Sequence, residues 1–159
     1  MRSRAVIAAC ALALASGQAG AAEPPFAVIA SPDVAPAALT RETLALIYRR
    51  RQLFWADGVR AQPVNLPAND PLRRAFSRCV LGQTPEQTED YWREMYFHGV
   101  VPPRVLASEQ AMRLFVASAR GAIAYVGTCP PGGGYVVLLT FGSVPDCPAH
   151  PASCVALQE

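Results

Sequence analysis

The sequence contains no lysine, and all 14 basic residues among its 159 are arginine. Charged side chains make up only 16% of the chain and apolar ones 52%, a balance that excludes long disorder and a charge-rich coiled coil. Arg2 and Arg4 lie in the first 22 residues, so the remainder carries 12 arginines against 12 acidic residues. Because that remainder is neutral, it has no overall field for nucleic acid or an anionic membrane, and anion contact requires a local patch.

Motifs of catalysis and cofactor binding are also missing. The chain has no Gly-x-Ser-x-Gly nucleophile motif, no phosphate loop ending in Gly-Lys-Ser/Thr and no dinucleotide-binding glycine pattern. Its two histidines, His98 and His150, are far apart and lack a neighbour that would set a tautomer. The sequence therefore predicts a protein that is not an enzyme and uses no cofactor.

No apolar run is long enough to span a bilayer, but the N-terminus has the pattern of a secretory signal peptide. A cationic start is followed by an uncharged run over residues 5–15 and by small residues up to Ala22. Residues 6–10 also resemble the box at which lipoproteins are acylated, although few apolar residues precede Cys10 and the run continues past it. We expect a signal peptide over 1–22, export to the periplasm, and one domain over 23–159 with a cysteine-containing tail.

Four cysteines remain after the expected signal peptide, and an even number in an oxidising compartment suggests two disulfides. Only six residues separate Cys147 from Cys154, so we expect these two to pair and Cys79 to pair with Cys129. A zinc site would need cysteines or histidines in close pairs, which the spacing does not provide. No metal is therefore expected.

Periodicity and turn residues predict an α/β domain. Strands are expected near 26–30, 63–66, 104–107, 121–127 and 135–141, and helices near 40–51, 71–81, 85–97 and 108–119. The tail from residue 142 is expected to be a loop. This alternation predicts a three-layer sandwich with a mixed, largely parallel sheet.

Candidate ligand contacts lie in loops that lead into helices, where free N–H groups favour anions. The loops over 31–40 and 66–72 are the candidates, with Arg73 and Arg74 near the second loop. We select Ser31, Asn69, Arg73 and Arg74 as ligand-binding residues. Asp70 argues against the second loop, because a carboxylate at the helix start competes with an incoming anion.

Two further clusters have a structural and a functional interpretation. The run Arg49-Arg50-Arg51 is either a solvated helix end or a patch for an anion or a partner. The aromatic residues at helical spacing are more often core than a carbohydrate platform, and the core interpretation is favoured here. They are Trp55, Tyr91, Trp92, Tyr96 and Phe97.

A set of motifs over residues 39–126 resembles phosphate-type substrate-binding proteins of ABC transporters. The family pattern contains a leucine-threonine helix ending near "IF-G", then "W-x-D-G", a "YW" helix, "F-x-G" and a strand reading "GAIGYV". The matching motifs here are Leu39-Thr40, Trp55-Ala56-Asp57-Gly58, Tyr91-Trp92, Phe97-His98-Gly99 and Gly121-Ala122-Ile123-Ala124-Tyr125-Val126.

The resemblance implies a periplasmic binding-protein fold, and the chain length allows a single lobe of it. It also implies a small anion such as phosphate as ligand, and a membrane permease or a sensor as partner. Two elements depart from the family pattern: residues 67–71 replace the Ser-Gly-Thr anion loop, and Ile47-Tyr48-Arg49-Arg50 replaces "IF-G". The alternative is a periplasmic interaction module that has lost ligand binding.

Overall fold

The computed structural model describes residues 24–34, 39–127, 133–144 and 146–151. The expected signal peptide over 1–22 lies outside these ranges, as do Cys129 and Cys154.

The expected order of strands and helices is confirmed, with one addition. A short strand, β6, follows β5 where a loop was expected, and the helix expected over 71–81 continues beyond α2 as a π-helical segment, η1. In chain order the elements are β1 (Phe26–Ala30), α1 (Arg41–Tyr48), β2 (Gln62–Asn65), α2 (Pro71–Phe76), η1 (Ser77–Leu81), a 3-10 turn η2 (Glu86–Thr88), α3 (Glu89–Phe97), β3 (Arg104–Val105), α4 (Glu109–Ser118), β4 (Ala122–Val126), β5 (Val136–Phe141) and β6 (Ala149–Pro151).

The strands form one mixed sheet in the order β3-β2-β4-β1-β5-β6. Parallel pairing is confined to β2, which lies between β3 and β4. The pairs of β1 with β4, β1 with β5 and β5 with β6 are all antiparallel. The mixed α/β sheet is thus confirmed, but the expectation that it is largely parallel is corrected, because β1 enters the middle of the sheet in the opposite direction.

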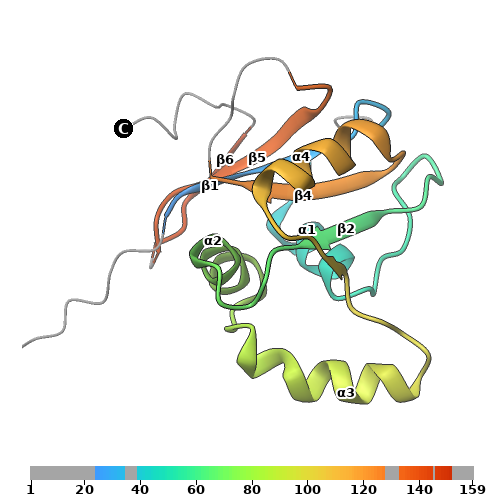
Figure 1. Cartoon of the computed structure of the whole chain (residues 1–159), viewed down its shortest axis with the longest axis vertical. Coiled ribbons are helices and arrows are strands. Elements are labelled where there is room, and N and C mark those ends of the chain that lie inside the picture. The colour runs from blue at the N-terminus through green and yellow to red at the C-terminus, as the bar shows by residue number, and fades with distance from the viewer. Residues whose placement is uncertain (1–23, 35–38, 128–132, 145, 152–159) are drawn as a thin grey trace, which may run out of the picture.

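Helices cover both faces of the sheet, which gives the expected three layers (Figure 1). α4 lies over β4 on one side, and α1 and α2 lie on the other. On the α1 and α2 side, the ring of Phe76 stacks on that of Tyr125 with centroids 4.1 Å apart, and Phe26 stacks on Phe141 at 4.7 Å. Burial of these large rings stabilises the packing on this side.

The helices α1, α2 and α4 begin where the sequence places a capping residue. Thr40 accepts the N–H of Thr43, Asp70 accepts that of Leu72 and Ser108 accepts that of Ala111. Each cap satisfies an N–H group that has no partner within its own helix.

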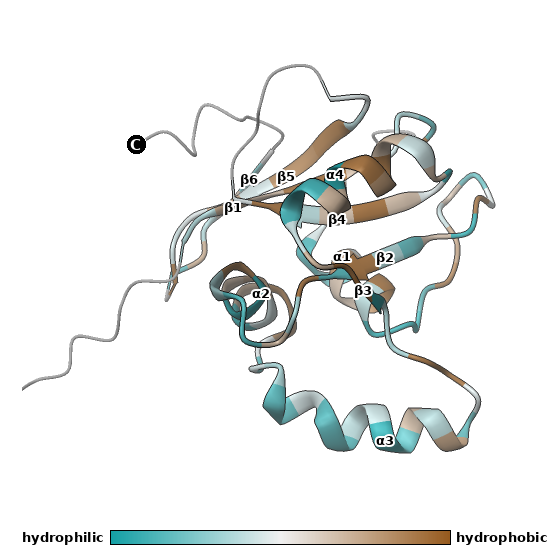
Figure 2. Cartoon of the chain, in the orientation of Figure 1, coloured by the Kyte–Doolittle hydropathy of each residue, from teal (hydrophilic) through white to brown (hydrophobic). Residues whose placement is uncertain are grey.

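α3 departs from the predicted packing, because it stands away from the sheet and buries none of its residues (Figure 1). Phe97 is 82% exposed and Tyr96 68%. Figure 2 shows α3 largely in hydrophilic colours up to its C-terminal end. The expectation that the aromatic residues of this helix belong to the core is therefore wrong.

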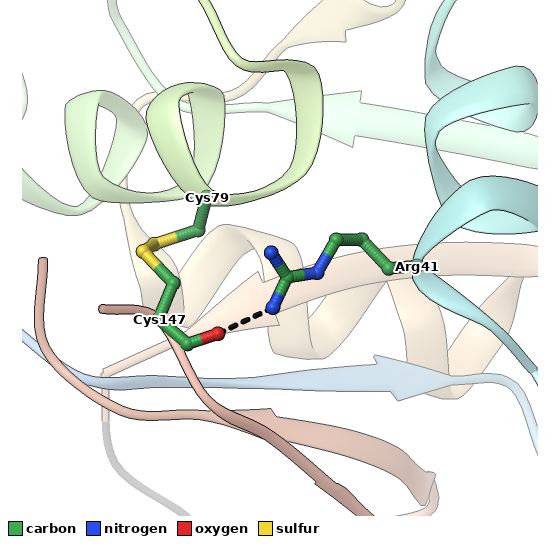
Figure 3. The surroundings of a disulfide bond; sticks show 3 residues. All are labelled: Arg41, Cys79 and Cys147. Carbon is green, nitrogen blue, oxygen red and sulfur yellow. Dashed lines mark hydrogen bonds between the residues drawn. A yellow bond between two sulfur atoms is a disulfide. The ribbon is translucent and has the colours of Figure 1, made fainter. Parts of the chain in front are cut away.

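One disulfide joins Cys79 of η1 to Cys147 in the tail, with the two Cα atoms 5.5 Å apart (Figure 3). Arg41 of α1 donates a hydrogen bond to the carbonyl oxygen of Cys147. The expected pairing of Cys147 with Cys154, and with it that of Cys79 with Cys129, is wrong. The fold brings the tail against η1, so the partner of Cys147 is 68 positions away in the sequence.

Candidate functional site

The C-terminal ends of β2 and β4 meet at one edge of the sheet, and α2 starts there. Asn65, the last residue of β2, is buried and accepts hydrogen bonds from the Arg73 guanidinium and from the Tyr125 hydroxyl. The Tyr125 oxygen in turn accepts the N–H of Leu66 at 3.1 Å. Arg73 is only 8% exposed, so this network holds a positive charge just under the surface of the edge.

Burial controls the protonation of this network. Desolvation raises the pKa of Tyr125 to about 12, and the nearby charge of Arg73 opposes the shift. Burial likewise raises the pKa of Tyr48, whose hydroxyl donates to the carbonyl oxygen of Val64. Both tyrosines therefore remain neutral hydrogen-bond donors at physiological pH.

Two carboxylates occupy the N–H groups that an anion would use at this edge. Asp70 accepts the N–H groups of Leu72 and Arg73 at 2.8 and 3.4 Å. Glu109 accepts the N–H of Gly127 at 2.8 Å, and Gly127 lies beside Leu72. Carboxylates of the chain itself thus already bind backbone donors at this edge, as the position of Asp70 in the sequence led us to expect.

The four residues selected from the sequence do not form one site. Arg73 is at the edge described above, whereas Arg74 forms an ion pair with Glu86 at 2.6 Å. Asn69 is exposed in the loop between β2 and α2. Because β1 runs antiparallel to β4, Ser31 at its end lies at the opposite edge, where its N–H binds the carbonyl oxygen of Ala122.

Sequence reasoning missed three participants in this edge. Asn65 is the last residue of a short strand, Tyr125 lies within a strand that is otherwise apolar, and Glu109 is in the first turn of α4. Asn65 ends a buried strand and is followed by Leu66 and Pro67. A polar residue at such a position needs a hydrogen-bond partner, and this requirement could have marked Asn65.

The described residues contain no cluster of three or more side chains that could hold a metal ion. Within the same ranges, no helix is both long and apolar enough to cross a bilayer.

Comparisons with known proteins agree with this fold. No protein-family model matches the sequence, and neither does any curated protein sequence. In solved structures, the chain is similar to an ABC-type phosphate transport receptor from Vibrio cholerae, with a TM-score of 0.58 and 19% identity over 74% of this chain and 47% of the receptor. It is similarly related to a putative phosphate ABC transporter substrate-binding protein with bound phosphate from Clostridium perfringens, with a TM-score of 0.58 and 15% identity over 74% of this chain and 46% of that protein.

The likeness at these identities is one of fold. The chain spans about half the length of the two receptors, as expected for a single lobe of the periplasmic binding-protein fold. Both of these neighbours are named as phosphate transport proteins, one as a receptor and the other as a putative substrate-binding protein.

Proposed function

We propose that this chain is an exported, single-lobe binding-protein-like domain that recognises a small anion such as phosphate, for an ABC transporter or a sensor in the periplasm. The observation that supports it is the buried Arg73 guanidinium, held by Asn65 at the C-terminal edge of β2. Ligands of open α/β sheets bind at such edges, and an arginine offers several donors to an oxyanion.

The carboxylates of Asp70 and Glu109 limit the strength of this binding. Each places a negative charge on backbone N–H groups beside the entry to Arg73. A dianion has to approach against these charges, so we expect weak binding of inorganic phosphate, in the range of about 1 mM.

The test is titration calorimetry of the purified protein with phosphate and with sulfate. Asp70→Asn keeps a capping oxygen but removes the charge, so phosphate affinity is expected to rise by about tenfold. Arg73→Ala is expected to abolish binding, with thermal melting to verify that the variant is folded. Arg74→Ala is the matched control, because Glu86 already neutralises that guanidinium, and it should change affinity little.

A second candidate, a periplasmic protein-interaction module, is favoured by the surface of α3. That helix exposes Tyr96 and Phe97 to solvent, and aromatic residues are enriched in protein interfaces. If neither the wild type nor Asp70→Asn shows heat or a thermal shift at about 10 mM anion, the anion proposal fails and this candidate replaces it.

A photo-crosslinking amino acid at position 97 then tests the interaction module in cells. The expected product is a crosslink to one membrane protein, such as a permease or a sensor. The control is the same amino acid at the exposed position 57, which lies in a turn away from α3 and should not capture that protein. Equal capture from both positions would reject a specific interface on α3.

A further inference from the structure

A second basic feature lies away from the edge that holds Arg73. Three arginines, Arg50, Arg60 and Arg104, line a pocket of about 260 Å³ beside β2 and β3, and its lining includes no acidic residue. Elsewhere in the described part of the chain, Arg74, Arg93, Arg113 and Arg120 each form an ion pair with a carboxylate. The pocket is therefore a local positive patch in a chain whose residues 23–159 contain 12 arginines and 12 acidic residues.

The backbone holds Arg50 in a conformation that arginine rarely adopts. Its φ is +59°, in the left-handed region, directly after the end of α1. The N–H of Arg50 binds the carbonyl oxygen of Ile47, and that of Arg51 binds the carbonyl oxygen of Leu46. This is the Schellman pattern, in which the position of Arg50 is usually glycine, because a side chain there costs about 1 kcal/mol.

In spite of this backbone cost, the Arg50 side chain forms little hydrogen bonding. The Arg50 guanidinium makes one long hydrogen bond, to the carbonyl oxygen of Ala61 at 3.4 Å. Burial, and next the positive charge of Arg60, lower the pKa of Arg50. A bound anion would relieve this repulsion between the two guanidinium groups.

The other wall of the pocket is apolar. The guanidinium carbon of Arg104 lies 4.9 Å from the centroid of the Phe115 ring, within the range of a cation–π contact. Val101 and the Pro102-Pro103 pair complete this wall. The lining thus combines guanidinium donors for an oxyanion with a surface suited to a small ring or hydrocarbon.

We infer that this pocket binds a small organic dianion, with an oxyanion group held by Arg50, Arg60 and Arg104 and an apolar body packed on Phe115 and the proline pair. Guanidinium groups bind both phosphate and carboxylate oxygens in bidentate fashion, so a phosphate monoester and a dicarboxylate share the chemistry. The site is separate from the edge that carries the proposed function.

The test uses phenyl phosphate as the probe, with inorganic phosphate and phenol as its two halves and phthalate as the dicarboxylate. By calorimetry, phenyl phosphate is expected to bind the purified protein about tenfold more tightly than inorganic phosphate, and phenol not at all. Affinity should fall as salt rises, because the attraction is electrostatic at a partly exposed site. The ratio of phenyl phosphate to phthalate affinity identifies which oxyanion the pocket prefers.

Two variants assign the binding to the pocket. Arg50→Gly suits the left-handed backbone, so it should remain folded and lose about tenfold in phenyl phosphate affinity, and Arg104→Gln should lose a similar factor. The matched control is Arg93→Gln, which removes an exposed arginine of α3 paired with Asp90 and should leave affinity unchanged.

Three results would overturn the inference. One is the absence of phenyl phosphate binding to the wild type at about 10 mM. Another is wild-type affinity in folded Arg50→Gly and Arg104→Gln. The third is loss of phenyl phosphate binding in Arg73→Ala with retention in Arg50→Gly, which would move the ligand to the sheet edge and leave the proposed function standing.

Discussion

Tyr125 links β4 to the loop after β2 through a single oxygen atom. That oxygen accepts the N–H of Leu66 and the hydroxyl donates to Asn65, so both deprotonation and removal of the hydroxyl affect the same contacts. A tyrosine in a buried strand usually needs such a partner. Its side chain therefore connects the core to the edge at which Arg73 is held.

Stability is expected to fall at alkaline pH because of Tyr125. Burial raises its pKa to about 12 in the folded state, whereas the unfolded value is about 10. The folded state thus binds the proton more tightly, and this contribution is complete below pH ~10 and lost as the pH rises to ~12. Urea unfolding across this range should show a loss of roughly 2 to 3 kcal/mol.

Tyr125→Phe serves as the comparison in that experiment. At neutral pH it is expected to cost about 1 to 3 kcal/mol, because the buried N–H of Leu66 loses its acceptor. Its stability should then decline less steeply with pH, with a remaining slope from Tyr48. An identical slope in wild type and variant would contradict the assignment to Tyr125.

The sequence predicted residue types better than their partners. Asp70 was identified both as a cap and as an obstacle to anions, and it has both roles in the structure. Ser31 and Arg73 were both selected for their place in or near a loop that leads into a helix, but strand direction places them at opposite edges. Direction depends on pairing between distant segments, which local periodicity does not contain.

At the scale of elements, α3 shows the limit of helical periodicity. Aromatic residues at helical spacing indicated a helix and a buried face, and only the helix is confirmed. Tyr91 anchors its first part by donating a hydrogen bond to the carbonyl oxygen of Arg49 at 2.7 Å. Beyond that anchor, the helix leaves the domain, and its apolar end faces solvent.

The double variant Tyr96→Ser, Phe97→Ser is expected to change the free energy of unfolding by less than about 0.5 kcal/mol. Both side chains are mostly exposed, so little buried area is lost. Denaturant unfolding measures this, with Tyr48→Ser as the contrasting change in a fully buried aromatic residue of α1. A loss of several kcal/mol in the double variant would mean that α3 is packed against the domain in solution.

At the scale of the whole molecule, the disulfide joins one helical layer to the segment between β5 and β6. Peptide mapping without reduction should recover Cys79 and Cys147 in one linked fragment. Recovery of Cys147 linked to Cys154 would instead restore the pairing expected from the sequence. That expectation relied on closeness along the chain, whereas the observed bond depends on how the tail folds back.

Loss of this bond is expected to destabilise the protein. The double variant Cys79→Ala, Cys147→Ala should lower the free energy of unfolding by about 2 to 4 kcal/mol, because the bond restricts a long loop in the unfolded chain. Urea unfolding of the wild type and the variant gives the difference. Unchanged stability would show that the hydrogen bond of Arg41 and the β5–β6 pairing hold the tail without it.

The position of β1 has a consequence for the order in which the chain can fold. β1 is the first strand of the sequence, yet both of its neighbours, β4 and β5, come from the last third of the chain. Ala27 pairs with Val126 and Phe26 with Phe141, so the central strand has no partner until those residues are available. Contacts this distant slow folding, and the centre of the sheet therefore cannot form until residues 122–141 have been synthesised.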